Sequence, residues 1–287
     1  MGVIALIAAA VLWGMIGPFS KIMFAEGVSP LETAFWRGNI AGLAYIIHGL
    51  LTRAPLPGKT SGRVHVVLFG IFGVALLEGS YVMAVKTGGA ALASVLLYSA
   101  PIWVNVTGFL FFKDRPPTRR WAALLLSFIG VAGLCLAGSE QTVKTSAIFW
   151  GLASGLSYAG FYIAGRQLFH KSSALGVFMI AFPVGSLAML PFIVTTADIP
   201  ALVAVTSIFH YTKTAQVICI LMGLISTYAA YLLYGYGLQR VGPGKSSIIT
   251  MIEPVVSVAL AVAFFGESFS VAGYGFAALV LIGVALA

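Results

Sequence analysis

Long apolar runs alternate with short polar segments along the whole chain. Each run approaches the roughly 20 residues that a helix needs to cross a bilayer. The pattern predicts an all-α membrane protein with ten transmembrane helices, at residues 3–24, 31–52, 64–85, 91–112, 119–137, 146–166, 173–194, 214–238, 245–265 and 270–286. The connecting loops are short, so consecutive helices should be antiparallel neighbours. The loop at 195–213 is long enough for a short interfacial helix.

The two halves of the chain match each other at a constant offset of 153 positions. Residues 92–113 and 245–266 align without a gap, which pairs Pro101 with Pro254, and the register continues to Gly130 and Gly283. This agreement predicts two repeats, residues 1–137 and 138–287. Five helices per repeat is an odd number, so the second repeat should cross the membrane upside down. Inverted repeats are typical of secondary transporters, with the substrate site between them; a duplicated scaffold without transport is the alternative.

Composition and charge agree with a polytopic membrane protein. The chain is 60% hydrophobic and only 8% charged, against about 25% charged in soluble proteins. Lys and Arg gather in the loops after the second, fourth, sixth and eighth spans, whereas the acidic residues Glu26, Glu140, Asp198 and Glu267 fall on the other side. The positive-inside rule therefore predicts that both termini are cytoplasmic. It also explains the net charge of +8 without a nucleic-acid partner.

Polar and aromatic residues recur on one face of several predicted helices, because residues three or four apart share a helix face. Turning these faces inward would line one central cavity, the expected substrate site. Its candidate residues are Trp13, Glu78, Tyr81, Tyr98, Tyr158, Tyr162, Tyr231, Tyr234, Ser247, Thr250 and Glu253. Pro101 and Pro254 should kink their helices and serve as gating points. Each candidate has a structural alternative: a tyrosine can bond a neighbouring helix, and a hydroxyl can bond its own backbone.

Other chemistries find no support in the sequence. Gly244-Lys245-Ser246 resembles the end of a phosphate-binding loop, but position 239 holds Gln239 instead of the required glycine. The histidines lack metal-ligand spacing, and Cys135 and Cys219 lie within apolar spans, as packing residues do. We therefore expect no cofactor, no metal, no ATP and no enzymatic activity. A membrane-embedded enzyme, a receptor and a channel are the rival classes.

The residues that carry these patterns also resemble a known family. The segment 223–267, with Glu253-Pro254 followed by an acidic residue, is similar to the EamA-like branch of the drug/metabolite transporter superfamily. In the first half the similarity includes Leu12-Trp13-Gly14, Ser29-Pro30 with Arg37, and the segment ending at Trp103. Lys113-Asp114 departs from the Gly-Glu that the family usually has there.

The resemblance implies a ten-helix exporter of two inverted repeats, with a cavity lined by helices 1, 3, 4, 6, 8 and 9. It implies a transporter of the bacterial inner membrane that exports small amphipathic metabolites by alternating access. Amino acids are the first expected substrates, and aromatic amino-acid exporters of the YddG type are the expected kind. A drug, purine or sugar-metabolite exporter is the alternative. Proton antiport through Glu78 or Glu253 and facilitated diffusion both stay open, as do a monomer and a dimer.

Overall fold

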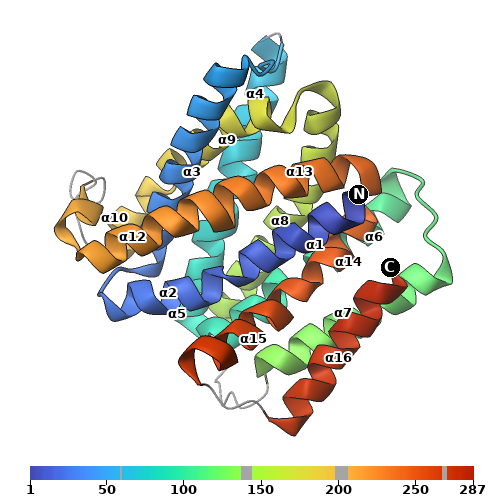
Figure 1. Ribbon diagram of the computed structural model, residues 1–287. Helices are drawn as coiled ribbons and strands as arrows, with labels where there is room; N and C mark the ends of the chain where they lie inside the picture. Colours follow the sequence, from blue (N-terminus) through green and yellow to red (C-terminus); the bar gives the residue numbers. More distant parts are fainter. Residues whose placement is uncertain (59, 137–143, 198–205, 267–269) are drawn as a thin grey trace.

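The computed structural model describes residues 1–58, 60–136, 144–197, 206–266 and 270–287, and these residues form helices and no strand (Figure 1). Glu140, Asp198, Glu267 and the expected repeat boundary at 137/138 lie outside the described residues. The α-helices are α1 Gly2–Gly14, α2 Ile16–Ala25, α3 Pro30–Thr52, α4 Thr60–Gly70, α5 Leu76–Leu97, α6 Ala100–Phe111, α7 Thr118–Leu136, α8 Thr145–Lys171, α9 Ala174–Ala188, α10 Leu190–Ala197, α12 Lys213–Leu221, α13 Ala230–Val241, α14 Pro243–Ile249, α15 Glu253–Phe265 and α16 Val271–Leu286. Two π-helical segments, η1 Ile71–Ala75 and η3 Met222–Ala229, and two 3₁₀ segments, η2 Ser207–His210 and η4 Thr250–Ile252, complete the described elements.

Within the described ranges, seven helical stretches are long and apolar enough to cross a membrane. They are Gly2–Ala25, Gly62–Leu97, Thr118–Leu136, Thr145–Lys171, Ala174–Val194, Lys213–Val241 and Pro243–Phe265. Two shorter apolar helices, Ala100–Phe111 and Val271–Leu286, accompany them. The chain is thus an all-helical, multi-pass membrane protein. In the loop at 195–213, the described part contains the end of α10, up to Ala197, and the short 3₁₀ segment Ser207–His210 ahead of α12.

The start of α3 is fixed by local sequence. The Ser29 hydroxyl accepts a hydrogen bond from the Glu32 backbone N–H, and the Glu32 side chain accepts one from the Ser29 backbone N–H. These two reciprocal hydrogen bonds form a capping box. Pro30 occupies the first helical position, where its missing N–H is not needed. This start places Arg37 two turns inside the helix, where its side chain is only 10% exposed.

Backbone irregularities recur at the offset found in the sequence. The π-helical segments η1 and η3 overlap under a shift of 153 positions. Gly89 and Gly242 share an unusual backbone conformation, with φ of 79° and 89° and ψ of 161° and 158°. Only glycine adopts this region without strain. In the same way, the helix breaks after Leu97 and again after Ile249, and Pro101 and Pro254 are the second residues of the helices that follow.

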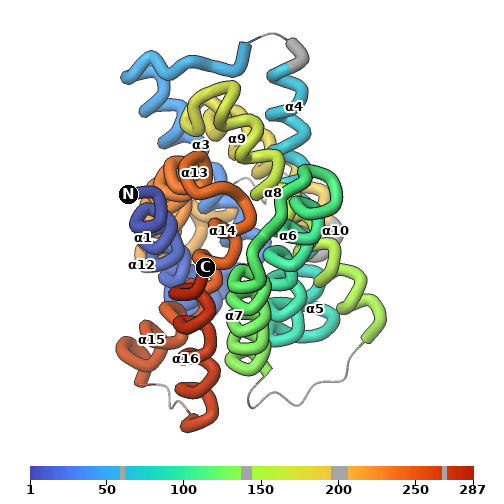
Figure 2. Tube along the Cα trace, turned by 90° about the vertical axis from the view of Figure 1, so that its right-hand side faces the viewer, coloured from blue at the N-terminus to red at the C-terminus, as the bar shows by residue number. Residues whose placement is uncertain are grey.

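Helices α7 and α16 lie side by side in both views (Figures 1 and 2). A Cβ added at Gly130 would lie 2.7 Å from the Phe276 carbonyl oxygen, and one at Gly283 would lie 2.7 Å from the Ala123 carbonyl oxygen. Glycine at these two positions therefore lets the two backbones touch.

The two chain ends lie at the same end of the helix bundle. Gly2 packs against Arg240 and Val241 at the end of α13. Near the other terminus, Arg119 at the start of α7 donates a hydrogen bond of 3.5 Å to the Ala285 carbonyl. Both termini therefore share one end of the molecule with basic loop residues, which we call the basic end.

Candidate functional site

An aromatic cluster fills the middle of the bundle, where α1, α8 and α13 meet. Trp13 lies 4.9 Å from Tyr231 and 5.4 Å from Tyr234, measured between ring centroids. Tyr162 lies 5.4 Å from Tyr234 and 4.9 Å from Tyr158. All five side chains are at least nine-tenths buried. These five residues, predicted as candidates from separate helices, form one contiguous surface, which we call the aromatic cluster.

Hydroxyl groups tie the aromatic cluster to the broken helix at η4. The Tyr162 hydroxyl donates to the Tyr158 hydroxyl at 3.2 Å and lies 2.5 Å from Thr250 Oγ1. Two polar atoms in the cluster, Trp13 Nε1 and the Tyr234 hydroxyl, are buried without a hydrogen-bond partner in the described part of the chain. A buried unsatisfied group costs about 1–3 kcal/mol. Polar groups kept at that cost are suited to receive a polar ligand.

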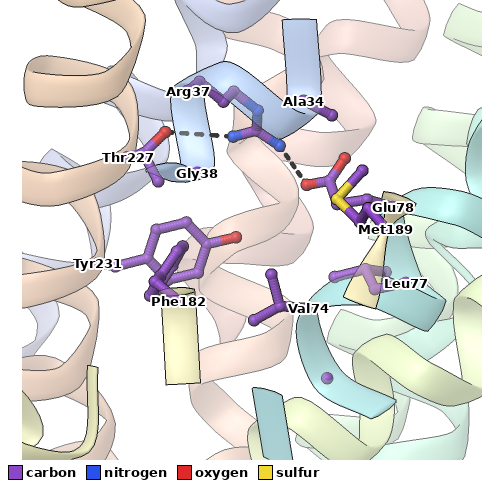
Figure 3. Close-up of a pocket in the computed structure, with 11 residues that line it drawn as sticks. Ala34, Arg37, Gly38, Val74, Leu77, Glu78, Phe182, Met189, Thr227 and Tyr231 are labelled. Carbon is purple, nitrogen blue, oxygen red and sulfur yellow. Dashed lines mark hydrogen bonds and ion pairs between the residues drawn. The ribbon is translucent and has the colours of Figure 1, made fainter. Parts of the chain in front are cut away.

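A buried ion pair lies beside the aromatic cluster. The Arg37 guanidinium of α3 donates from Nη2 to the Glu78 carboxylate of α5 and from Nη1 to Thr227 Oγ1 of η3 at 3.3 Å (Figure 3). Its Thr227 and Glu78 partners lie within or next to the π-helical segments, which often occur at functional sites. Ionisable groups at membrane depth are costly and usually face a substrate or ion pathway.

Arg37 is the residue that sequence reasoning missed as a site candidate. In the sequence it contributes only to the family resemblance, whereas the structure places it two turns inside α3. The signal that could have found it is the sequence Ser29-Pro30-x-Glu32, which fixes the start of the helix and hence the depth of Arg37.

A small cavity of about 10 Å³ connects the ion pair to the aromatic cluster. Arg37 and Glu78 line one part of it, and Tyr231 and Phe182, with ring centroids 5.0 Å apart, line another (Figure 3). The charged groups and the aromatic surface therefore face the same space. In this conformation that space has room for about one water molecule.

Glu253 and Tyr98 form a second polar group near the helix break. Tyr98 packs with Val131, Met251 and Val280, apart from the aromatic cluster. The Glu253 carboxylate lies close enough to Tyr98, Arg37 and Glu78 to interact with them electrostatically. Both predicted carboxylates, Glu78 and Glu253, therefore interact with the same cation, Arg37.

The remaining candidates make local contacts. Tyr81 pairs with Ser94 at 3.1 Å, and the Ser247 hydroxyl donates to the Gly244 carbonyl at 2.9 Å within its own helix. For these two residues the contacts match the structural alternative. Pro101 is buried and Pro254 is half-buried, each just after a helix break.

A larger pocket, of about 430 Å³, opens at the basic end between α6, α8 and α14. We call it the basic-end pocket. Its lining contains none of the predicted site residues. Among the described residues no group of three His, Cys, Asp or Glu side chains could hold a metal ion.

Comparison with known proteins decides the family. The model of the EamA-like transporter family matches residues 1–136 and 145–287. The chain belongs to the EamA-like transporter family. Its multi-pass helical architecture and its polar, aromatic interior are therefore those of a membrane transporter.

Three relatives of this EamA-like protein match it over most of the length of both chains. An uncharacterized transporter of Archaeoglobus fulgidus is 26% identical over 287 residues, which covers 100% of this chain and 96% of that protein. The uncharacterized inner membrane transporter YicL of Salmonella typhimurium is 26% identical, and the match covers 94% of this chain and 89% of that protein. The uncharacterized transporter YwfM of Bacillus subtilis is 25% identical and covers 96% and 90%.

A solved crystal structure shares the fold of this EamA-like chain. The TM-score is 0.81 over 99% of this chain and 95% of the other, with 18% sequence identity. At that identity the likeness concerns the arrangement of the helices and carries no substrate.

Proposed function

We propose that this EamA-like protein is a secondary transporter that exports small amphipathic metabolites, amino acids first, by alternating access. The observation that carries the proposal is the buried Arg37–Glu78 ion pair facing the aromatic cluster across one small cavity. Arg37 can hold a substrate carboxylate, because guanidinium matches that group in shape and charge. Glu78 or Glu253 can hold an ammonium group, and the aromatic cluster offers a large apolar surface.

The two halves act in this proposal as inverted five-helix repeats within ten transmembrane helices. The α7–α16 contact supports it, since Gly130 meets Phe276 and Ala123 meets Gly283. Under the offset of 153, each of these contacts is the counterpart of the other. Moving along α7 from 123 to 130 moves the contact on α16 backwards, from 283 to 276, so the helices are antiparallel. A two-fold axis between antiparallel helices runs across them, in the membrane plane, which is the geometry of an inverted repeat.

The direction of transport follows from charge. We assign the basic end to the cytoplasm by the positive-inside rule, in a bacterial inner membrane, with both termini inside. The basic-end pocket then opens to the cytoplasm while the aromatic cluster is packed shut. Pro101 and Pro254, next to the helix breaks, are the proposed gating points. Export of an intracellular metabolite would begin from such a conformation.

The class of substrate is the finer part of the proposal. An aromatic amino acid, as moved by exporters of the YddG type, would place its ring in the aromatic cluster. Drugs, purines and sugar metabolites are the alternatives, and they lack the paired carboxylate and ammonium that Arg37 and the carboxylates complement. Proton antiport and facilitated diffusion differ in whether a pH gradient drives the flux.

The test is efflux from proteoliposomes. Tyr98→Ala and Thr250→Ala are expected to lower export of a tryptophan analogue at least about tenfold, because a misplaced site loses large factors in rate. Tyr274→Ala is the matched control, since the Tyr274 side chain is 62% exposed on α16. Wild-type rates in both site variants would contradict the site, and single-channel conductance would indicate a channel.

A further inference from the structure

The basic-end pocket is lined by both apolar and charged residues. Its apolar lining includes Val104 of α6 and Ile163 of α8. Its polar lining includes Asp114, Arg120, Arg166, His170 and Lys245. Its volume of about 430 Å³ lies within the range of small-molecule sites. The pocket therefore has the shape and the two-part lining of a site for an amphipathic molecule.

The basic side chains that line the basic-end pocket outnumber its acidic side chains. Arg120 Nη1 donates to Asp114 Oδ2 at 2.8 Å, and this is the only carboxylate in the pocket lining. Arg166 is half-buried and makes no hydrogen bond or ion pair within the described ranges of the chain. Lys245 is exposed at the mouth. Three cations thus face one anion, and a half-buried guanidinium is left to bind an added acidic group.

The backbone between Gly242 and Gly244 lies next to both arginines. Arg166 Nη1 lies directly against Gly242, where a Cβ would displace it. Arg120 Nη1 would lie 3.5 Å from a Cβ at Gly244. Gly242 has a positive φ of 89°, a conformation that suits glycine alone.

Two buried polar atoms beside the same segment also lack a partner. Arg120 Nε and Asn105 Oδ1 make no hydrogen bond in the described part of the chain. Asn105 is only 2% exposed, and its Oδ1 would lie 2.8 Å from a Cβ at Gly244. Both atoms are themselves buried, so the free donors that line the pocket are those of Arg166, beside the positive charge of Arg120.

We propose that the basic-end pocket binds the acidic head group, a carboxylate or a phosphate, of an amphipathic small molecule, with its apolar part against Val104 and Ile163. Arg166 is the principal anchor, because arginine recognises both oxyanions through paired N–H donors. The inference rests on the proposed transport function, in which this pocket is the cytoplasmic loading site. Ile163 follows Tyr162 of the aromatic cluster in α8, so one helix contributes to both the pocket and the cluster.

The test is ligand-dependent thermal unfolding of the purified full chain in neutral detergent. The probes are 3-phenylpropionate, phenyl phosphate and phenethylamine, which share a ring and differ in charge. We expect the two acids to raise the Tm and the amine to leave it unchanged. Arg166→Gln should weaken 3-phenylpropionate binding about tenfold or more, as the loss of a charge-assisted pair does.

Arg240→Gln is the matched control, because Arg240 lies at the same end, stacks on Tyr236 and is outside the pocket. It should bind both acids as the wild type does. Equal shifts for the acids and the amine, or full binding by Arg166→Gln, would overturn the proposal. So would the absence of any acid effect with stabilisation only in nanodiscs that contain phosphatidylglycerol, because the head group would then belong to a lipid.

Counterflow distinguishes this inference from the function on which it rests. Acid binding that depends on Arg166, in a protein without counterflow, supports the pocket and contradicts transport. Counterflow with no acid binding contradicts the pocket and leaves transport standing.

Discussion

Replacing Arg37 with methionine is expected to lower the free energy of unfolding by about 3–5 kcal/mol and to abolish transport. The loss of one partner from a buried ion pair leaves the other charge uncompensated, and this costs about 3–5 kcal/mol. Here the stranded charge is Glu78, whose side chain is 19% exposed. SDS titration measures the stability, and proteoliposome efflux measures the transport.

The double variant R37M/E78L separates structure from function. Removing both charges together is often neutral for stability, so this variant should recover most of the stability lost in Arg37→Met. It should not recover transport if the guanidinium holds a substrate carboxylate. A double variant that transports like the wild type would reduce the ion pair to a structural role.

Gly130→Ala and Gly283→Ala are expected to destabilise the protein by similar amounts, about 1–3 kcal/mol each, which is typical of overpacking. An added methyl at either position meets a backbone carbonyl 2.7 Å away, which cannot rotate aside. That the two variants lose similar amounts of stability is a more specific prediction than the size of either loss. It follows from the proposed two-fold relation between the α7 and α16 contacts, and thermal unfolding in detergent measures it.

Gly275→Ala is the control for this pair. Gly275 also lies in α16, but no atom lies within 4 Å of an added Cβ. In this variant the better helix propensity of alanine, worth up to about 1 kcal/mol, should be the only effect. A large loss in one glycine variant and none in the other would contradict the two-fold relation.

The helical architecture could be predicted from the sequence because the bilayer restricts which backbone structures can cross it. Every backbone group in lipid must be satisfied within the chain, so apolar runs of about 20 residues must be helical. The register of 153 likewise located the breaks before Pro101 and Pro254. The matching conformation of Gly89 and Gly242 could not be predicted, since glycine alone does not specify a positive φ.

The candidate site could be predicted only in part. Tyr158 and Tyr162 are one turn apart, as are Tyr231 and Tyr234, and helix periodicity was enough to predict a shared face. The contacts of Tyr81 with Ser94 and of Ser247 with its own backbone depend on side-chain conformations that periodicity does not determine. Arg37 was missed because its depth depends on where α3 starts. The basic-end pocket was missed because its cations were interpreted only as signals of orientation.

Counterflow in proteoliposomes tests the central claim, that a carrier site lies between the two halves. Vesicles are loaded with unlabelled amino acids, nucleobases or drugs, and uptake of labelled phenylalanine is followed with and without a pH gradient. The account predicts saturable uptake that internal amino acid accelerates and that Thr250→Ala abolishes. Uptake that no internal compound accelerates, or that rises linearly with concentration, would contradict it.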